Sequence, residues 1–364
     1  MIKKISLMLI MLILAPGLSI SGGDGCWVSM EVLTLPNDGT GERWGPWTFD
    51  YGIDPEGLNE GLVIKNVRYN GHLILQKGSM PVVRVKYRGT ERDISSGCGP
   101  YSDRINLGHV CIVRNSLGRT TQVTKRFFWD VEGRPTAMEI GILAHIGGYS
   151  LFQTWIFSSD RAMEARLYSG GWSCDLEISD FLSGRGLTAL DHRHHAYWML
   201  DFDMGTSESN RIWEYRGEAA FTPTYPLYEG MTTTLGLSSN PVWVIYNSEL
   251  THPLYGLHVV FTRPESMSRS DPFAEFSDPL GPPWYGFSRI DAAWRRWRSE
   301  EASVGWEFPG ELEYDYPAES VVDTDIVVWA VGHLTHILGP HDNPGLPLPD
   351  MPWHGARIAI SVYE

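Results

Sequence analysis

The chain has 364 residues and a formal net charge of −15, with 15 tryptophans, 16 tyrosines, 38 glycines and 23 prolines. This acidic balance excludes a nucleic-acid partner, because no basic patch is available to neutralise phosphates. Abundant aromatic residues with frequent Gly and Pro are typical of many strands joined by tight turns, so we expect a mostly β fold.

The first 21 residues have the pattern of a secretory signal peptide. Lysines at positions 3 and 4 precede an apolar run over residues 5–14, and small residues follow at 19 and 21. The apolar run is too short to span a bilayer comfortably. We therefore expect residues 1–21 to be removed and the protein to be secreted or periplasmic, with no membrane contact after cleavage.

The cysteines are consistent with secretion. Cys26, Cys98, Cys111 and Cys174 allow two disulfides in an extracytoplasmic compartment. Cys98 with Cys111 is the most local pairing, whereas the partners of Cys26 and Cys174 stay open.

Strand patterns follow along most of the chain. Residues 27–33 alternate in polarity, 36–45 are rich in turn residues, and the alternating run 61–76 around Asn70 and Gly71 predicts a hairpin. Pro81 begins a further apolar run that predicts a separate strand. Other strands are expected at 47–51, 81–87, 110–113, 126–130, 137–146, 149–157, 162–169, 211–220, 242–246 and 356–362.

One basic, Trp-containing piece, residues 292–298, stands beside the acidic residues Glu300 and Glu301. We expect it to be a short helix or a loop with a solvated face. No internal repeat or linker occurs, so the organisation expected is a lead-in over residues 22–46 and one domain over residues 47–364.

Metal-ligand residue types gather in the stretch 191–205. A strand there would turn His192 and His194 to one side and Asp201 and Asp203 to the other, because alternate residues share a face. The imidazoles suit a transition metal and the carboxylates suit a hard cation. A surface histidine cluster is the alternative interpretation.

Several separated stretches together resemble the C-terminal catalytic domain of copper amine oxidases, in that family's order. This resemblance implies a large antiparallel β-sandwich, an extracellular primary-amine oxidase and a homodimer. It rests on residues 61–64 and 67–69, 138–157, 192–194 with 200–203, 325–329 with 332–336, and 343–347.

The resemblance implies copper(II) held by three histidines. His192 and His194 match the family's His-X-His strand, and His336 matches its Gly-X-X-X-His pattern. His333 and His341 are rivals on composition alone. Zinc would suit the same ligands, so the residues themselves leave the metal open.

A peripheral calcium-type site is the second metal site implied by the family. Its matching positions are the side chains of Asp201, Asp203 and Asp325 and the main-chain carbonyls of Phe202 and Ile326. Such oxygens suit Ca²⁺. Capped turns with surface carboxylates are the alternative.

Tyr149 stands where the family oxidises a tyrosine to topaquinone, whose carbonyl condenses with a primary amine. The family's Asn-Tyr-(Asp/Glu)-Tyr motif reads here Gly148, Tyr149, Ser150 and Leu151, so the tyrosine persists without its neighbours. An ordinary strand tyrosine is the alternative.

The family's general base belongs to a segment that is shortened in this chain. Asp93 stands near the expected place and is the candidate for proton abstraction, with Glu91 and Asp103 as rivals. A solvated loop carboxylate is the alternative for each of the three.

Two functions follow from these residues. The first is a copper- and topaquinone-dependent oxidase that turns a small primary amine, water and dioxygen into an aldehyde, ammonia and hydrogen peroxide. The second is a non-enzymatic, copper-binding relative with an unmodified Tyr149. A carbohydrate-binding sandwich, suggested by the many tryptophans alone, is a third.

Overall fold

The computed structural model describes fifteen parts of the chain, and every regular element within them is a β-strand. No helix long and apolar enough to cross a membrane occurs among them. The described residues are 28–53, 61–87, 104–105, 122–146, 149–171, 192–205, 208–215, 228, 230–232, 242–249, 256–262, 265–266, 292–298, 319–336 and 354–363.

The first sheet has ten antiparallel strands. Its order is β1-β7-β8-β9-β10-β19-β15-β14-β12, with β16 paired to β19. The strands are β1 (Val28–Leu35), β7 (Val123–Trp129), β8 (Pro135–Ile146), β9 (Tyr149–Ser158), β10 (Ala162–Gly171), β12 (Asn210–Tyr215), β14 (Val242–Asn247), β15 (His258–Thr262), β16 (Glu265–Ser266) and β19 (His354–Tyr363).

The second sheet has nine antiparallel strands. Its order is β13-β17-β18-β11-β5-β4-β3-β2, with β6 paired to β5. The strands are β2 (Asp38–Trp44), β3 (Trp47–Ile53), β4 (Leu62–Tyr69), β5 (His72–Tyr87), β6 (Arg104–Ile105), β11 (His192–Phe202), β13 (Gly230–Thr232), β17 (Ala292–Arg296) and β18 (Ile326–His336).

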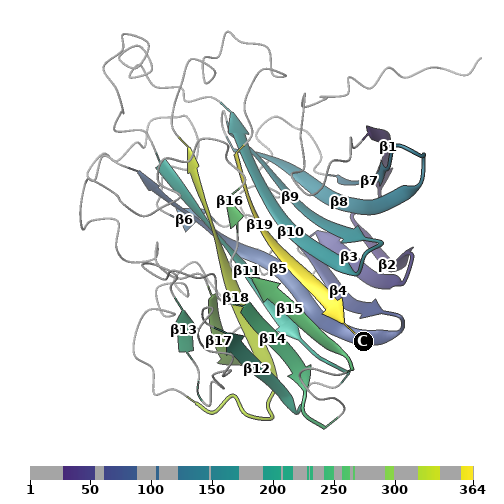
Figure 1. Ribbon diagram of the computed structural model, residues 1–364. Helices are drawn as coiled ribbons and strands as arrows, with labels where there is room; N and C mark the ends of the chain where they lie inside the picture. Colours follow the sequence, from purple (N-terminus) through teal and green to yellow (C-terminus); the bar gives the residue numbers. More distant parts are fainter. Residues whose placement is uncertain are drawn as a thin grey trace, which may run out of the picture.

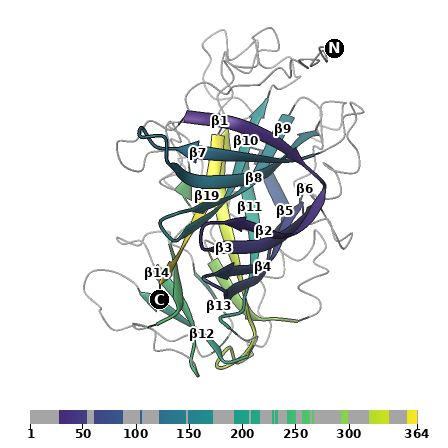
Figure 2. The same cartoon turned by 90° about the vertical axis from the view of Figure 1, so that its right-hand side faces the viewer.

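The two sheets pack face to face, which confirms the predicted mostly β sandwich. Figures 1 and 2 show β19 of the first sheet running beside β18 of the second. Trp155 and Trp198 are fully buried, and the rings of Phe49 and Phe157 stack with centroids 4.2 Å apart. Since Phe49 is on β3 and Phe157 on β9, this stack joins the sheets.

A polar contact also crosses the interior. The Leu62 N–H donates to Gln153 Oε1 (2.8 Å), and its carbonyl accepts from Gln153 Nε2 and Trp155 Nε1 (3.0 Å each). Gln153 is buried, so these bonds satisfy an amide that would otherwise cost free energy in the core. They fix the start of β4 against β9, the strand that begins at Tyr149.

The hairpin predicted at Asn70 and Gly71 is confirmed between β4 and β5. Their φ angles are 47° and 85°, the left-handed values that a two-residue hairpin turn requires. The separate strand predicted from Pro81 is wrong, because β5 continues through it. Met80 and Pro81 together oppose Trp198 of β11, so the proline sits at a bulge where its missing N–H does no harm.

Two other expectations are wrong. The turn-rich residues 36–45 contain β2, an edge strand with a bulge between Gly39 and Glu42. Residues 292–298 begin with β17, whose Ala292, Ala293 and Trp294 are buried. In the second case the main-chain bonds to β18 decide the conformation, which a local pattern does not reveal.

The other described strands match the predictions at 47–51, 126–130, 137–146, 149–157, 162–169, 242–246 and 356–362. The strand predicted at 110–113 lies outside the described residues.

Candidate metal centres

The strand register brings the three predicted copper ligands to one end of the second sheet. On adjacent antiparallel strands, His192 of β11 is directly opposite His336 of β18, and His194 is two residues further along β11. Opposed residues have Cα atoms about 5 Å apart and share a face, as do alternate residues of one strand. All three positions therefore fall on one face.

That face is the inner one, toward the first sheet. Ala196, Trp198 and Leu200 of β11 belong to the main core, as do Val328 and Ala330 of β18. The pairing of β11 with β18 has no register shift, so the same alternation reaches positions 192, 194 and 336.

The register also separates the rivals. His333 is directly opposite His195, and both positions fall on the outer face of the sheet. His333 therefore does not share a face with His192 and His194. His341 lies outside the described residues.

Tyr149 is the first residue of β9 in the other sheet. It is opposite Ile146 of β8 and Gly171 of β10. Counted along β9, its position shares a face with Trp155 and Phe157, which belong to the main core. In Figure 1 the arrowheads of β10 and β18 lie at the same upper end, so Tyr149 and the histidine positions are at one end of the sandwich.

The three predicted calcium-type carboxylates meet at the opposite end of β11. Asp201 is near the end of β11, Asp203 directly follows β11, and Asp325 directly precedes β18. One oxygen from each lies within 4.8 Å of the others. Asp201 and Asp203 are only 7% and 6% exposed, and the Oδ1 atom of all three residues is buried without a hydrogen-bond partner.

Burial raises the pKa of all three carboxyl groups, and repulsion between carboxylates adds to the rise for Asp201 and Asp325. Burial and the neighbouring Asp325 and Asp203 raise the pKa of Asp201, and burial with Asp203 raises that of Asp325. Burial alone raises the pKa of Asp203 to about 6. An ionised cluster of this kind is costly without a compensating positive charge.

Part of that compensation comes from Lys77, which sequence reasoning missed. Lys77 is buried on β5 directly opposite Asp201, and its charge lowers the pKa of Asp201. With all four groups ionised, three carboxylates and one ammonium leave two negative charges, and the charge of Arg296 also lowers the pKa of Asp325. The oxygen-only ligand set and the net negative charge fit a divalent cation such as Ca²⁺.

The residues of the two predicted carbonyl ligands, Phe202 and Ile326, are directly opposed on β11 and β18. Other predicted positions lie outside the described residues: Asp93 with its rivals Glu91 and Asp103, and the four cysteines Cys26, Cys98, Cys111 and Cys174.

Solved structures of copper amine oxidases share this fold. A copper-containing benzylamine oxidase from Hansenula polymorpha matches with a TM-score of 0.60 and 15% identity, over 90% of this chain and 61% of that one. A lysyl oxidase from Pichia pastoris matches with a TM-score of 0.56 and 14% identity, over 88% of this chain and 51% of that one. An amine oxidase from Aspergillus nidulans matches with a TM-score of 0.53 and 12% identity, over 88% of this chain and 51% of that one.

The chain thus covers less than two thirds of the length of each of these proteins, at identities that show the fold alone. No family model and no curated protein sequence matches it.

Proposed function

We propose that the protein is a secreted, copper- and topaquinone-dependent primary-amine oxidase. It would convert a small primary amine, water and dioxygen into an aldehyde, ammonia and hydrogen peroxide. The observation that carries this proposal is the register of β11 and β18, which aligns His192, His194 and His336 on the face toward the sheet that contains Tyr149.

The roles of the residues follow from their chemistry. Neutral imidazoles of His192, His194 and His336 would hold copper. Tyr149 is the side chain whose oxidation would yield topaquinone, and that group would supply an electrophilic carbonyl and an electron sink for the amine. Asp93 would accept the proton that the bound amine loses.

The carboxylate cluster would hold a structural calcium ion. Unpartnered, buried oxygens of Asp201, Asp203 and Asp325 support this part of the proposal. Calcium there would join the end of β11 to the start of β18, the two strands that supply the histidines at their other ends. A homodimer, which the resemblance implies, is testable by sedimentation.

A second candidate function is a non-enzymatic copper-binding protein of the same fold with an unmodified Tyr149. The sequence around the tyrosine favours it, because Gly148 and Ser150 replace the family's motif neighbours. In this case His192, His194 and His336 would bind copper, and no quinone would form.

A visible spectrum of the apo protein, before and after aerobic addition of Cu(II), distinguishes the two. For the oxidase we expect a new quinone band, and phenylhydrazine should form a hydrazone on the Tyr149 peptide. A Tyr149→Phe variant is the matched control, since it keeps the ring and the histidines but should develop no band. Stoichiometric copper with an unmodified Tyr149 would reject the oxidase in favour of the second candidate.

A further inference from the structure

We propose that residues Ser209, Asn210 and Arg211, together with Asp323, form a brace that sets the spacing of Asp203 and Asp325 before a cation binds. The proposal rests on the cation site proposed above and assigns it positioning residues.

Asn210 connects the two chain segments that carry the ligands. It is fully buried, and its Oδ1 accepts a hydrogen bond from the Met204 N–H (3.2 Å). Its main chain forms an isolated β-bridge with Thr324. Since Met204 follows Asp203 and Thr324 precedes Asp325, this one residue fixes both neighbours of the cluster.

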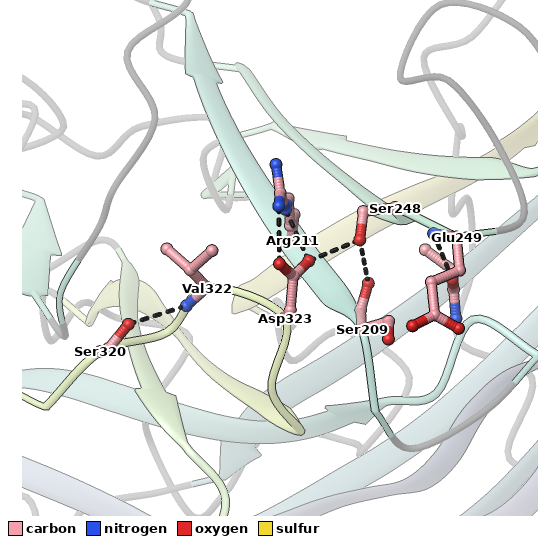
Figure 3. A network of polar contacts seen from close by, with 8 residues as sticks. Ser209, Arg211, Ser248, Glu249, Ser320, Val322 and Asp323 are labelled. Atoms are coloured by element: carbon pink, nitrogen blue, oxygen red, sulfur yellow. Dashed lines mark hydrogen bonds and ion pairs between the residues drawn. The ribbon is translucent and has the colours of Figure 1, made fainter.

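Arg211 and Asp323 add a second connection, shown in Figure 3. Arg211 Nε donates to Asp323 Oδ1 (2.7 Å) and Arg211 Nη2 donates to Asp323 Oδ2 (2.6 Å). This bidentate ion pair fixes the orientation of the Asp323 carboxylate as well as its distance from Arg211. The single hydroxyl proton of Ser248 is shared between Asp323 Oδ1 and the Ser209 carbonyl (3.2 Å), and the Ser248 N–H also donates to that carbonyl (2.8 Å). Three separate turns are thereby joined.

The backbone at these turns needs such support. Ser209 and Asp323 have φ angles of 66° and 53°, a left-handed conformation that costs non-glycine residues on the order of 1 kcal/mol. Such conformations persist where surrounding contacts determine them. Here the contacts are those of Arg211 and Ser248, and the turn at Asp323 leads within two residues to Asp325.

The brace would hold the carboxylates close together before a cation binds. When no cation is present, like charge repels Asp201 from Asp203 and Asp325, and Asp325 from Asp203, once these carboxyl groups are ionised. The Trp297 N–H donates to the Asp325 carbonyl (3.0 Å) and anchors that residue from the β17 side. Because the segments that carry Asp203 and Asp325 are both anchored, the ligands are in position before the cation binds. Little of the binding free energy is then lost in ordering them.

Electrostatics alone predicts the opposite effect for one substitution. Arg211→Gln removes a positive charge near the cluster and leaves Asp323 unpaired, so simple attraction would tighten cation binding. Loss of the brace would weaken it. Arg211→Lys keeps the charge and removes the two-pronged geometry, so it should weaken binding too.

The test is calcium titration of the full chain by calorimetry, with the wild type, Arg211→Gln and Arg211→Lys. We expect both variants to lose about tenfold in affinity, which is typical when a side chain that orients a metal ligand is removed. Arg134→Gln is the matched control, because it breaks the Arg134–Asp130 ion pair (2.7 Å) in the β7–β8 turn and should leave affinity unchanged. Thermal unfolding of the calcium-free variants separates a positioning role from a general loss of stability.

Different failures have different meanings. If Asp203→Asn binds calcium as tightly as the wild type, or the wild type binds none, the cation site itself is wrong. If the wild type binds calcium and Arg211→Gln binds equally or more tightly, the site stands and the brace is wrong. Should Arg211→Gln fail to fold, Ser248→Ala removes only part of the network and must still weaken binding for the brace to hold.

Discussion

The two ends of β11 carry different chemistry on opposite faces of the same sheet. At its start, positions 192 and 194 fall on the inner face beside His336. At its end, Asp201 and Asp203 lie with Asp325 in a separate buried cluster. About 23 Å of strand separates positions 194 and 201, from a rise of about 3.3 Å per residue.

The two ends of β11 differ in which sheets supply the residues of the site. The three carboxylates of the cluster come from the end of β11 and the residues directly after β11 and before β18, so a single sheet suffices. The histidine positions come from the same two strands, but Tyr149 belongs to the other sheet. Metal binding therefore depends on one sheet, while the proposed amine chemistry depends on the packing of both. A protein of this fold can keep the first and lose the second.

The largest effect should follow from His194→Ala. We expect it to abolish copper binding and, with it, any quinone formation, because two imidazoles do not replace three. Copper content by atomic absorption and the visible spectrum measure both. His195→Ala is the control, since position 195 is on the outer face and its loss should leave copper bound. Stoichiometric copper in His194→Ala would remove this residue from the ligand set.

A smaller effect, confined to the other end, should follow from Asp203→Asn. Removing a charged ligand from the cluster should cost about 3 kcal/mol of calcium-binding free energy, roughly a hundredfold in affinity. Calorimetry measures it. Copper content should not change, because the two sites share strands but no residues. A variant that loses copper as well would show that the two ends are coupled through β11.

Sequence reasoning succeeded where local chemistry decides the structure. Asn70 and Gly71 tolerate positive φ, so their hairpin was predictable, and the alternation along residues 192–203 gave the two faces of β11. The third histidine position and Asp325 came from the resemblance, since no local rule relates β18 to β11.

The neighbours of the cation site depend on non-local pairing. Lys77 opposes Asp201 only because β5 has one extra residue at Met80 and Pro81, which shifts every partner beyond the bulge. Asn210 acts through a main-chain bridge to Thr324, far along the chain. Neither relation leaves a pattern in the sequence.

A pH dependence of folding stability should follow from the carboxylate end of β11. In the folded, calcium-free protein the pKa of Asp203 is raised to about 6, so the folded state holds a proton that the unfolded state releases near pH 4. Folding stability from this group is therefore present below about pH 4 and is lost as the pH rises to about 6, by about 1.4 kcal/mol for each unit of pKa shift. The raised pKa values of Asp201 and Asp325 act in the same direction.

Saturating calcium should remove this loss, because the ion compensates the ionised carboxylates in the folded state alone. Chemical denaturation from pH 4 to pH 8, with and without calcium, measures the difference, and Asp203→Asn should show a reduced slope without calcium. Copper is left out of this titration, because its proposed imidazole ligands must themselves lose protons over this pH range before they can bind it. If folding stability has the same pH dependence with and without calcium, the carboxylate cluster holds no cation. Metal binding would then be confined to the histidine end of β11.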